Sequence, residues 1–234
     1  MNTRARVLDA LGEVHDPELD EPITSLGFVT SCQVTLDGDV AVVLRLPTPQ
    51  CAPNFAYLMA ADARNVVRRM PGVRHVTVRL EDHYTGEEIN AAVGRGEGFT
   101  RAFPGETDDD DLQALRRLFQ RKALVARQSR LCEVLLADGA TPEQVIARRV
   151  ADLPDIPDAR RCLELRGDLG IPREEDSPAF VLPSGQPIAG GDLTRWLRTA
   201  RLVRMSLEVN GGICRSLLQI RHGLAVDDPE EVAR

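Results

Sequence analysis

Residues 40–53 read VAVVLRLPTPQCAP, and this stretch decides what kind of fold the chain can form. It starts as an apolar run rich in valine, which is typical of a β-strand. It continues as a loop with three prolines around Cys51, and residues 54–69 then carry apolar side chains at helical spacing. A strand, a stiff loop and a helix in this order indicate the first part of a β-α-β unit.

The segments on either side complete a small module. Residues 28–36 form another β-rich run, separated from the first strand by an Asp-Gly turn at 37–38 that is typical of hairpins. Residues 3–14 have helical spacing, and residues 73–80 alternate as a third strand. We therefore expect an α-β-β-α-β module, in which a mixed sheet is covered by two helices.

The second half of the chain predicts a mostly helical domain. Three glycines at positions 94–98 and the aspartate run 108–111 indicate a boundary. The segments that we expect beyond it are helices over 112–136, from Thr141, over 159–169, 192–204 and 213–222, and a small hairpin over 180–188. The predicted fold class is α+β, with an N-terminal module of residues 1–98 and a mostly α-helical C-terminal domain of residues 107–234.

Composition excludes several classes of protein. The chain has 234 residues and a net charge of −7, which argues against a nucleic-acid binder. No run approaches the ~20 apolar residues of a membrane span. We expect a cytoplasmic protein, because scattered cysteines without a disulfide pattern suit a reducing compartment. The five cysteines are scattered without any CxxC pair, which predicts neither disulfides nor a zinc site. Four of them fall on strand or helix positions and are expected in the core: Cys32, Cys132, Cys162 and Cys214.

Cys51 is the candidate functional residue. A cysteine between a strand and a helix has its thiolate favoured by free backbone N–H groups and by the helix dipole. Flanking prolines stiffen its loop, and Thr48 brings a hydroxyl nearby. The alternative is that Cys51 is a small apolar residue packed at the start of a helix. Position alone does not decide between the two.

The acidic segment Asp16-Pro17-Glu18 is the second candidate. It is either a solvated turn capped by Asp16 or, if it shares one end of the sheet with Cys51, the carboxylate part of a mixed oxygen and sulfur site for a transient metal. His83, which follows the third strand, is a further candidate metal ligand, with a capping or surface role as the alternative.

Several motifs resemble one known family. Residues 14–19 read VHDPEL, 26–29 read LGFV, 46–53 read LPTPQCAP and 72–78 read GVRHVTV. In this order they are similar to the signature of the MIP18-like (DUF59) family over about residues 4–82. The family usually has proline directly after the cysteine, whereas Ala52 stands between Cys51 and Pro53 here.

The family includes proteins that help to assemble or deliver iron–sulfur clusters, and relatives linked to metallo-oxygenase systems. The resemblance implies an accessory protein, not an enzyme, that matures a client metalloenzyme such as a multicomponent diiron monooxygenase. It further implies Cys51 as the key thiol, supported by Asp16, Glu18 and Thr48, and an iron–sulfur cluster or iron held transiently. The partners expected are the client and a second copy of the chain, with no nucleic acid and no membrane.

Two alternatives stay open. One is a metal-free chaperone or scaffold that holds an apo-enzyme, and the other is a thiol enzyme, which lacks a histidine partner identifiable in the sequence. The helical domain is expected to dock a client or a second copy. Arginines at 195, 198, 201 and 204 predict a basic stripe that faces an acidic partner.

Overall fold

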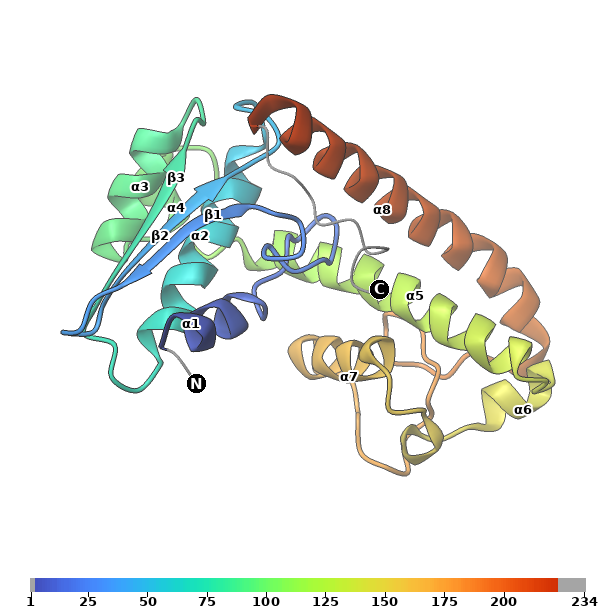
Figure 1. Ribbon diagram of the computed structural model, residues 1–234. Helices are drawn as coiled ribbons and strands as arrows, with labels where there is room; N and C mark the ends of the chain where they lie inside the picture. Colours follow the sequence, from blue (N-terminus) through green and yellow to red (C-terminus); the bar gives the residue numbers. More distant parts are fainter. Residues whose placement is uncertain (1–2, 223–234) are drawn as a thin grey trace. The chain divides into compact units, whose positions relative to one another are not determined.

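The computed structural model describes residues 3–222 (Figure 1). The chain divides into two compact units, one of which joins Met1–Ala114 to Asn210–Arg234, whereas the other is Leu115–Val209. The ends of the two predicted domains, residues 1–2 and 223–234, lie outside the described residues.

The first unit is built on a three-stranded mixed sheet, as predicted. Strands β1 (Val29–Val34) and β2 (Asp39–Arg45) are antiparallel, and β3 (His75–Glu81) runs parallel to β2 on its other side. The β1–β2 turn requires glycine at Gly38, because φ is 86° there and a Cβ atom would lie 2.2 Å from the carbonyl oxygen of Gly72.

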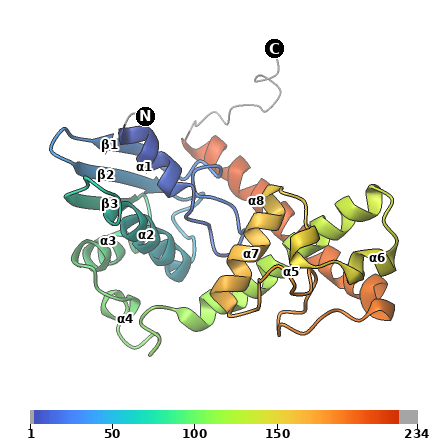
Figure 2. The ribbon, with the colours of Figure 1, turned by 90° about the horizontal axis from the view of Figure 1, so that it is seen from below.

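Helices cover one face of this sheet (Figure 2). Val40, Val42 and Leu44 of β2 are buried with Val78 and Leu80 of β3, while alternate residues are more exposed, as one covered face requires. The helices of the unit are α1 (Thr3–Leu11), α2 (Pro53–Arg68), α3 (Gly86–Arg95) and the short α4 (Phe99–Ala102). The expected cover of two helices was therefore incomplete, since α3 packs against both β3 and α2.

The second unit is helical, as predicted. Its elements are the main part of α5 (Gln113–Ala137), α6 (Pro142–Ala147), η1 (Val150–Asp152), α7 (Pro157–Leu169), η2 (Gly190–Asp192) and the start of α8 (Leu193–His222). Thr141 caps α6 in a capping box with Gln144, which confirms the predicted helix start. The expected hairpin is reduced to one bridge between Val181 and Pro187.

Helix α8 corrects two expectations. It runs unbroken for 30 residues, where two helices were predicted, because glycine lowers helix stability by only ~1 kcal/mol and does not end a helix by itself. Three of the four arginines of the predicted basic stripe are paired within the chain. Arg201 and Arg204 both pair with Glu133 of α5, and Arg195 pairs with Asp192 at 3.3 Å.

No helix within residues 3–222 combines the length and the apolar character that crossing a bilayer requires.

Candidate functional site

Three loops of the first unit meet at one end of the sheet. β1 begins where β2 ends, since Val29 pairs with Leu44, and Arg45 at the end of β2 is beside Glu81 at the end of β3. The segment before β1, the Cys51 loop after β2 and the turn after β3 therefore emerge together. The register thus brings the two candidate loops of the sequence to the same end of the sheet.

Cys51 is half-buried in a loop held by its own backbone. Its N–H donates to the carbonyl of Thr48 at 3.4 Å, and the Thr48 hydroxyl lies 3.5 Å from the Cys51 Sγ. The same hydroxyl accepts from the Gln50 N–H at 3.2 Å. Pro53 then begins α2, where Ala52 provides no side-chain cap and the Phe55 N–H donates to Asn54 Oδ1 at 2.9 Å. The thiol therefore stands in a stiff loop next to the start of a helix.

His83 ties the end of β3 to this loop. Its Nε2 lies 2.8 Å from the carbonyl oxygen of Cys51, and its Nδ1 lies 3.1 Å from the Thr85 hydroxyl and 3.3 Å from the Thr85 N–H. Burial lowers the pKa of His83, an effect opposed by the bond to the Cys51 carbonyl. A neutral ring that accepts at Nδ1 donates from Nε2, so His83 holds the Cys51 backbone. The predicted ligand role of His83 stays a prediction.

Asp16 is buried, with 7% of its surface exposed. Its Oδ1 accepts from the N–H groups of Glu18 at 2.8 Å and Leu19 at 3.0 Å, so it caps its own turn. Burial raises the pKa of Asp16 to about 6, although these two bonds lower it. Asp16 therefore caps its turn, as the first alternative predicted, but its side chain is buried and not solvated. Glu18 beside it is half-buried.

Cys214 is a further candidate residue, which the sequence analysis assigned to the core. Cys32, Cys132 and Cys162 are buried, as expected for core residues, whereas Cys214 is only half-buried. The pKa of its thiol is raised to about 11, first by burial and then by the negative charges of Asp16, Cys51 and Glu18. Arg215, the next residue of the helix, pairs with Glu21, so Cys214 lies beside the acidic loop. The sequence carried no signal of this, because α8 comes so much later in the chain.

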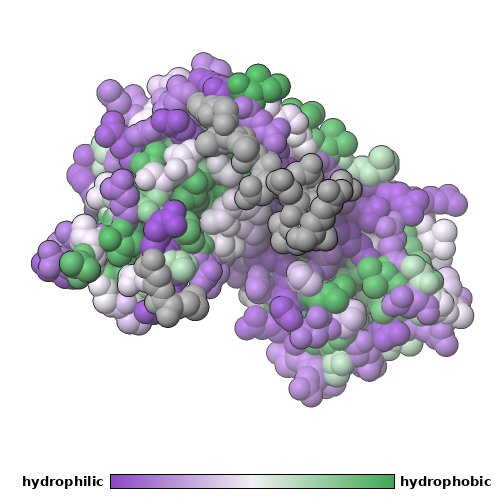
Figure 3. Space-filling model, viewed as in Figure 1, coloured by the Kyte–Doolittle hydropathy of each residue, from purple (hydrophilic) through white to green (hydrophobic). Residues whose placement is uncertain are grey.

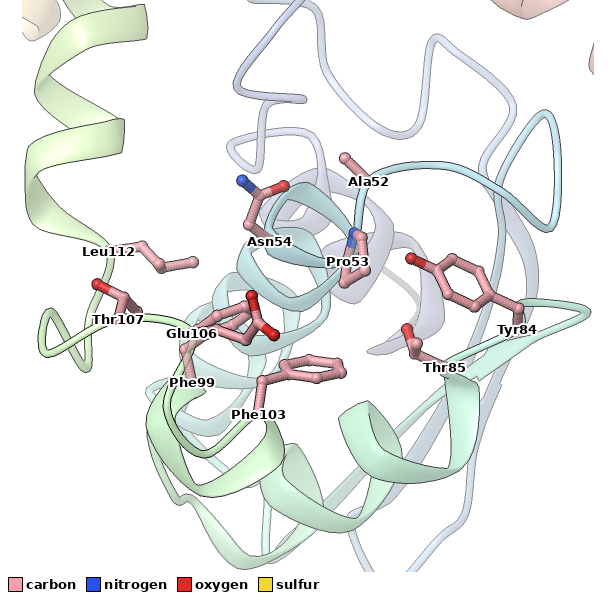
Figure 4. Close-up of a pocket in the computed structure, with 10 residues that line it drawn as sticks. All are labelled: Ala52, Pro53, Asn54, Tyr84, Thr85, Phe99, Phe103, Glu106, Thr107 and Leu112. Carbon is pink, nitrogen blue, oxygen red and sulfur yellow. The ribbon is translucent and has the colours of Figure 1, made fainter.

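An open cleft of about 570 Å³ adjoins the Cys51 loop (Figure 4). Tyr84 and Thr85 line one side of it, and Phe103 and Glu106 line the other, with Pro53 between them. The rest of the lining is Ala52, Asn54, Phe99, Thr107 and Leu112. The cleft is partly apolar and partly polar, which suits the docking of another molecule next to the loop.

The side chains at this end of the sheet offer sulfur and oxygen atoms as metal ligands. Thiols are the preferred ligands of iron–sulfur clusters, and carboxylates and hydroxyls bind harder ions. Within residues 3–222, no set of three or more His, Cys, Asp or Glu side chains is arranged to hold a metal ion.

Comparison with known proteins gives consistent matches. A family model described as iron–sulfur cluster assembly protein matches residues 4–80. The chain is 33% identical over 90 residues to an uncharacterized protein of Methanocaldococcus jannaschii, a match that covers 38% of this chain and 93% of that protein. It is also 37% identical over 75 residues to an iron–sulfur cluster carrier protein of Deinococcus radiodurans, covering 32% of this chain and 20% of the carrier.

Proposed function

Since the chain belongs, through its N-terminal MIP18-like domain, to the family of iron–sulfur cluster assembly proteins, we propose that it is an accessory protein in the maturation of a client metalloenzyme. Its cargo is iron or an iron–sulfur cluster, held transiently at Cys51 and passed on to the client. In this role the protein binds and delivers the cargo, and it is not itself an enzyme.

The placement of Cys51 is the observation that carries this proposal. The thiol is half-buried, lies at the open end of the sheet and sits next to a cleft, so cargo and client can both approach it. Thr48 and the clamp by His83 fix the loop, which lowers the entropy lost when cargo binds. Asp16 shapes the neighbouring turn, and Glu18 supplies negative charge beside it.

The proposal also names a class of client and a cellular compartment. The relative from Deinococcus radiodurans is named a carrier, and the matched segment spans a fifth of its length. Delivery of the cargo to a client is the corresponding role for this chain. A multicomponent diiron monooxygenase is the client class that the family resemblance favours. We place the protein in the cytoplasm, where free thiols stay reduced. Co-purification from the native host identifies the client.

Anaerobic reconstitution tests the role of Cys51. The full chain is incubated with ferrous iron and sulfide, and cluster formation is followed by absorbance and by analysis of bound iron and sulfide. We expect wild type to take up both and Cys51→Ser to lose most of this uptake while keeping its circular dichroism spectrum. Cys162→Ala, which removes a buried thiol of the second unit, serves as the control. Equal uptake by wild type and Cys51→Ser would contradict the proposal.

A second function, a metal-free scaffold for an apo-enzyme, is favoured by the outer face of α8. Large apolar side chains recur there at helical spacing and are exposed, and Figure 3 shows the hydrophobic colour along the upper edge of this helix. They are Leu202, Met205, Val209, Ile213, Leu217 and Ile220. A protein that stays colourless and metal-free in the reconstitution but still co-purifies with a client would support the scaffold.

A further inference from the structure

We infer that Cys214 of α8 is the second thiol of the Cys51 site, so that iron or an iron–sulfur cluster is bound by a pair of thiolates from two distant parts of the chain. This inference rests on the proposed function and deepens it, because it names a ligand that the matched segment, residues 4–80, does not contain.

One face of α8 packs on the first unit, and Cys214 lies on that face. Residues 211, 214, 215, 218 and 221 follow one another at intervals of three, one, three and three along the helix, so they share one side of it. Gly211 and Leu218 on this side are buried, and Leu218 has only 2% of its surface exposed. Cys214 therefore points in the same direction as residues that are covered by the first unit.

The neighbours of Cys214 on this face show what covers it. Arg215 pairs with Glu21, which belongs to the same acidic loop as Asp16. The Glu21 carboxylate also lies 2.9 Å from the position that a Cβ atom on Gly211 would occupy. Leu218 Cδ2 lies 3.4 Å from the corresponding Cβ position of Gly27, just before β1. These contacts fix the helix against the segment that leads into the sheet.

A further contact fixes the end of the helix beside the Cys51 loop. Arg221 Nη2 lies 3.1 Å from Asp82 Oδ2, and Asp82 directly precedes His83, whose ring holds the Cys51 carbonyl. Cys214 thus lies between a helix contact to the Asp16 loop and a helix contact to the turn that clamps Cys51. The charges of Asp16 and Cys51 act on its thiol, in agreement with this placement.

Two thiols suit transient binding. An iron–sulfur cluster usually has four thiolate ligands, so this pair supplies half of a set, and the remaining positions are filled from outside the chain. Binding replaces each S–H bond by an Fe–S bond and releases the proton to solvent, with no change of oxidation state. An incomplete set lets a client exchange its own thiolates for these two.

Titration with Cd²⁺ alone tests the pair without relying on client activity. The full chain, kept reduced and anaerobic, is titrated while thiolate-to-metal charge-transfer absorbance is recorded. We expect wild type to show the absorbance of two thiolates per bound ion. Cys214→Ser and Cys214→Ala should each lose about half of it, as should Cys51→Ser, whereas Cys162→Ala should match wild type. Circular dichroism verifies that each variant is folded.

Reconstitution with iron and sulfide then separates this inference from the proposed function. If Cys51→Ser loses uptake but the Cys214 variants match wild type in uptake and in Cd²⁺ absorbance, the second thiol is refuted while the proposed function stands. If wild type takes up no cluster, the proposed function fails, and the Cd²⁺ signature still decides whether the pair exists. If the Cys214 variants do not fold, wild type is treated with a trivalent arsenical and the modified residues are identified by peptide mapping. We then expect one arsenic atom to bridge Cys51 and Cys214. An adduct on a single thiol would overturn the pair.

Discussion

At the scale of single residues, the site combines a buried acid with nearby thiols. Asp16 is almost fully covered, and a carboxylate in such a place is stable only when its oxygens accept hydrogen bonds. The N–H groups of Glu18 and Leu19 supply these bonds, yet burial outweighs them, and the pKa of Asp16 is raised to about 6. The native state therefore holds a proton on Asp16 at pH values where the unfolded chain has lost it.

This proton makes stability depend on pH. With a pKa near 6 in the native state and 3.8 in the unfolded chain, Asp16 favours folding below pH 3.8, and this contribution is lost as the pH rises through 6. The difference corresponds to roughly 3 kcal/mol. In Asp16→Asn the side-chain carbonyl still accepts both N–H groups but does not ionise. We therefore expect the free energy of unfolding of Asp16→Asn, relative to wild type, to rise between pH 4 and 6 and to level off above pH 6.

Urea denaturation followed by circular dichroism at several pH values measures this difference. Ser25→Ala is the control, because it alters the same loop without removing a carboxylate; its hydroxyl only donates to the carbonyl of Pro22. The difference between Ser25→Ala and wild type should not change with pH. A difference for Asp16→Asn that is equally flat would show that Asp16 ionises alike in both states.

Only those residues of the candidate site that local sequence patterns mark out could be predicted. Cys51, Asp16 and Thr48 stand in loops whose prolines and polar residues mark them out, and the strand register brings their loops together. Cys214 was assigned to the core because its helix gives no local sign of what it packs against. Its position depends on the pairing of Arg215 with Glu21 and of Arg221 with Asp82, which no periodicity encodes.

At the scale of elements, periodicity and turn residues located most of the strands and helices. Helix α3 was missed, although Ile89, Ala92 and Val93 have helical spacing and Glu87 and Glu88 lie in its first turn. The three glycines at positions 94–98 predict a boundary, but Gly94 lies inside this helix and Gly96 ends it with φ of 72°. The break predicted within α8 was wrong because its glycines have helical neighbours on both sides and one of them allows a close approach to Glu21.

Gly211 and Gly212 provide a matched test of how α8 packs. Alanine is favoured over glycine inside a helix by about 1 kcal/mol. A Cβ atom on Gly212 would meet nothing within 4 Å, so Gly212→Ala should raise the free energy of unfolding by about 0.5–1 kcal/mol. On Gly211 it would lie 2.9 Å from Glu21 Oε1, so Gly211→Ala should gain less, since the carboxylate that pairs with Arg215 must move. Equal gains in urea denaturation would mean that α8 does not pack on the Glu21 loop.

At the scale of the whole molecule, each unit has a core of its own. The core of the second unit contains Leu124, Leu131, Leu165 and Phe180, and some of the polar side chains buried with it are hydrogen-bonded to the backbone. Gln128, for example, accepts from the Val181 N–H at 2.8 Å and donates to its carbonyl at 2.9 Å. Composition and helical spacing predict an α+β chain with a helical second half. They do not show that residues 210–222 return to the first unit, because a continuous helix has no local signal at the crossing.

Arg166 is the test of the second core. It is 1% exposed, and its guanidinium donates to the carbonyls of Pro178 at 3.0 Å and Ala179 at 3.3 Å and also to that of Pro172. Arg166→Met keeps the aliphatic part of the side chain but leaves these carbonyl oxygens, of which that of Ala179 is buried, without their charged donor, at a cost of about 2–3 kcal/mol.

Trp196, the one tryptophan of the chain, packs against this core, so its fluorescence in urea reports the unfolding of the second unit. We expect a lower midpoint for Arg166→Met. The control is Arg195→Met, since the Arg195 side chain is 84% exposed and pairs only with Asp192 among the ion pairs described. Its free energy of unfolding should differ from that of wild type by less than ~0.5 kcal/mol. If the two variants unfold at the same urea concentration, the three carbonyls do not depend on Arg166, and the apolar cluster alone would then account for the stability of the second unit.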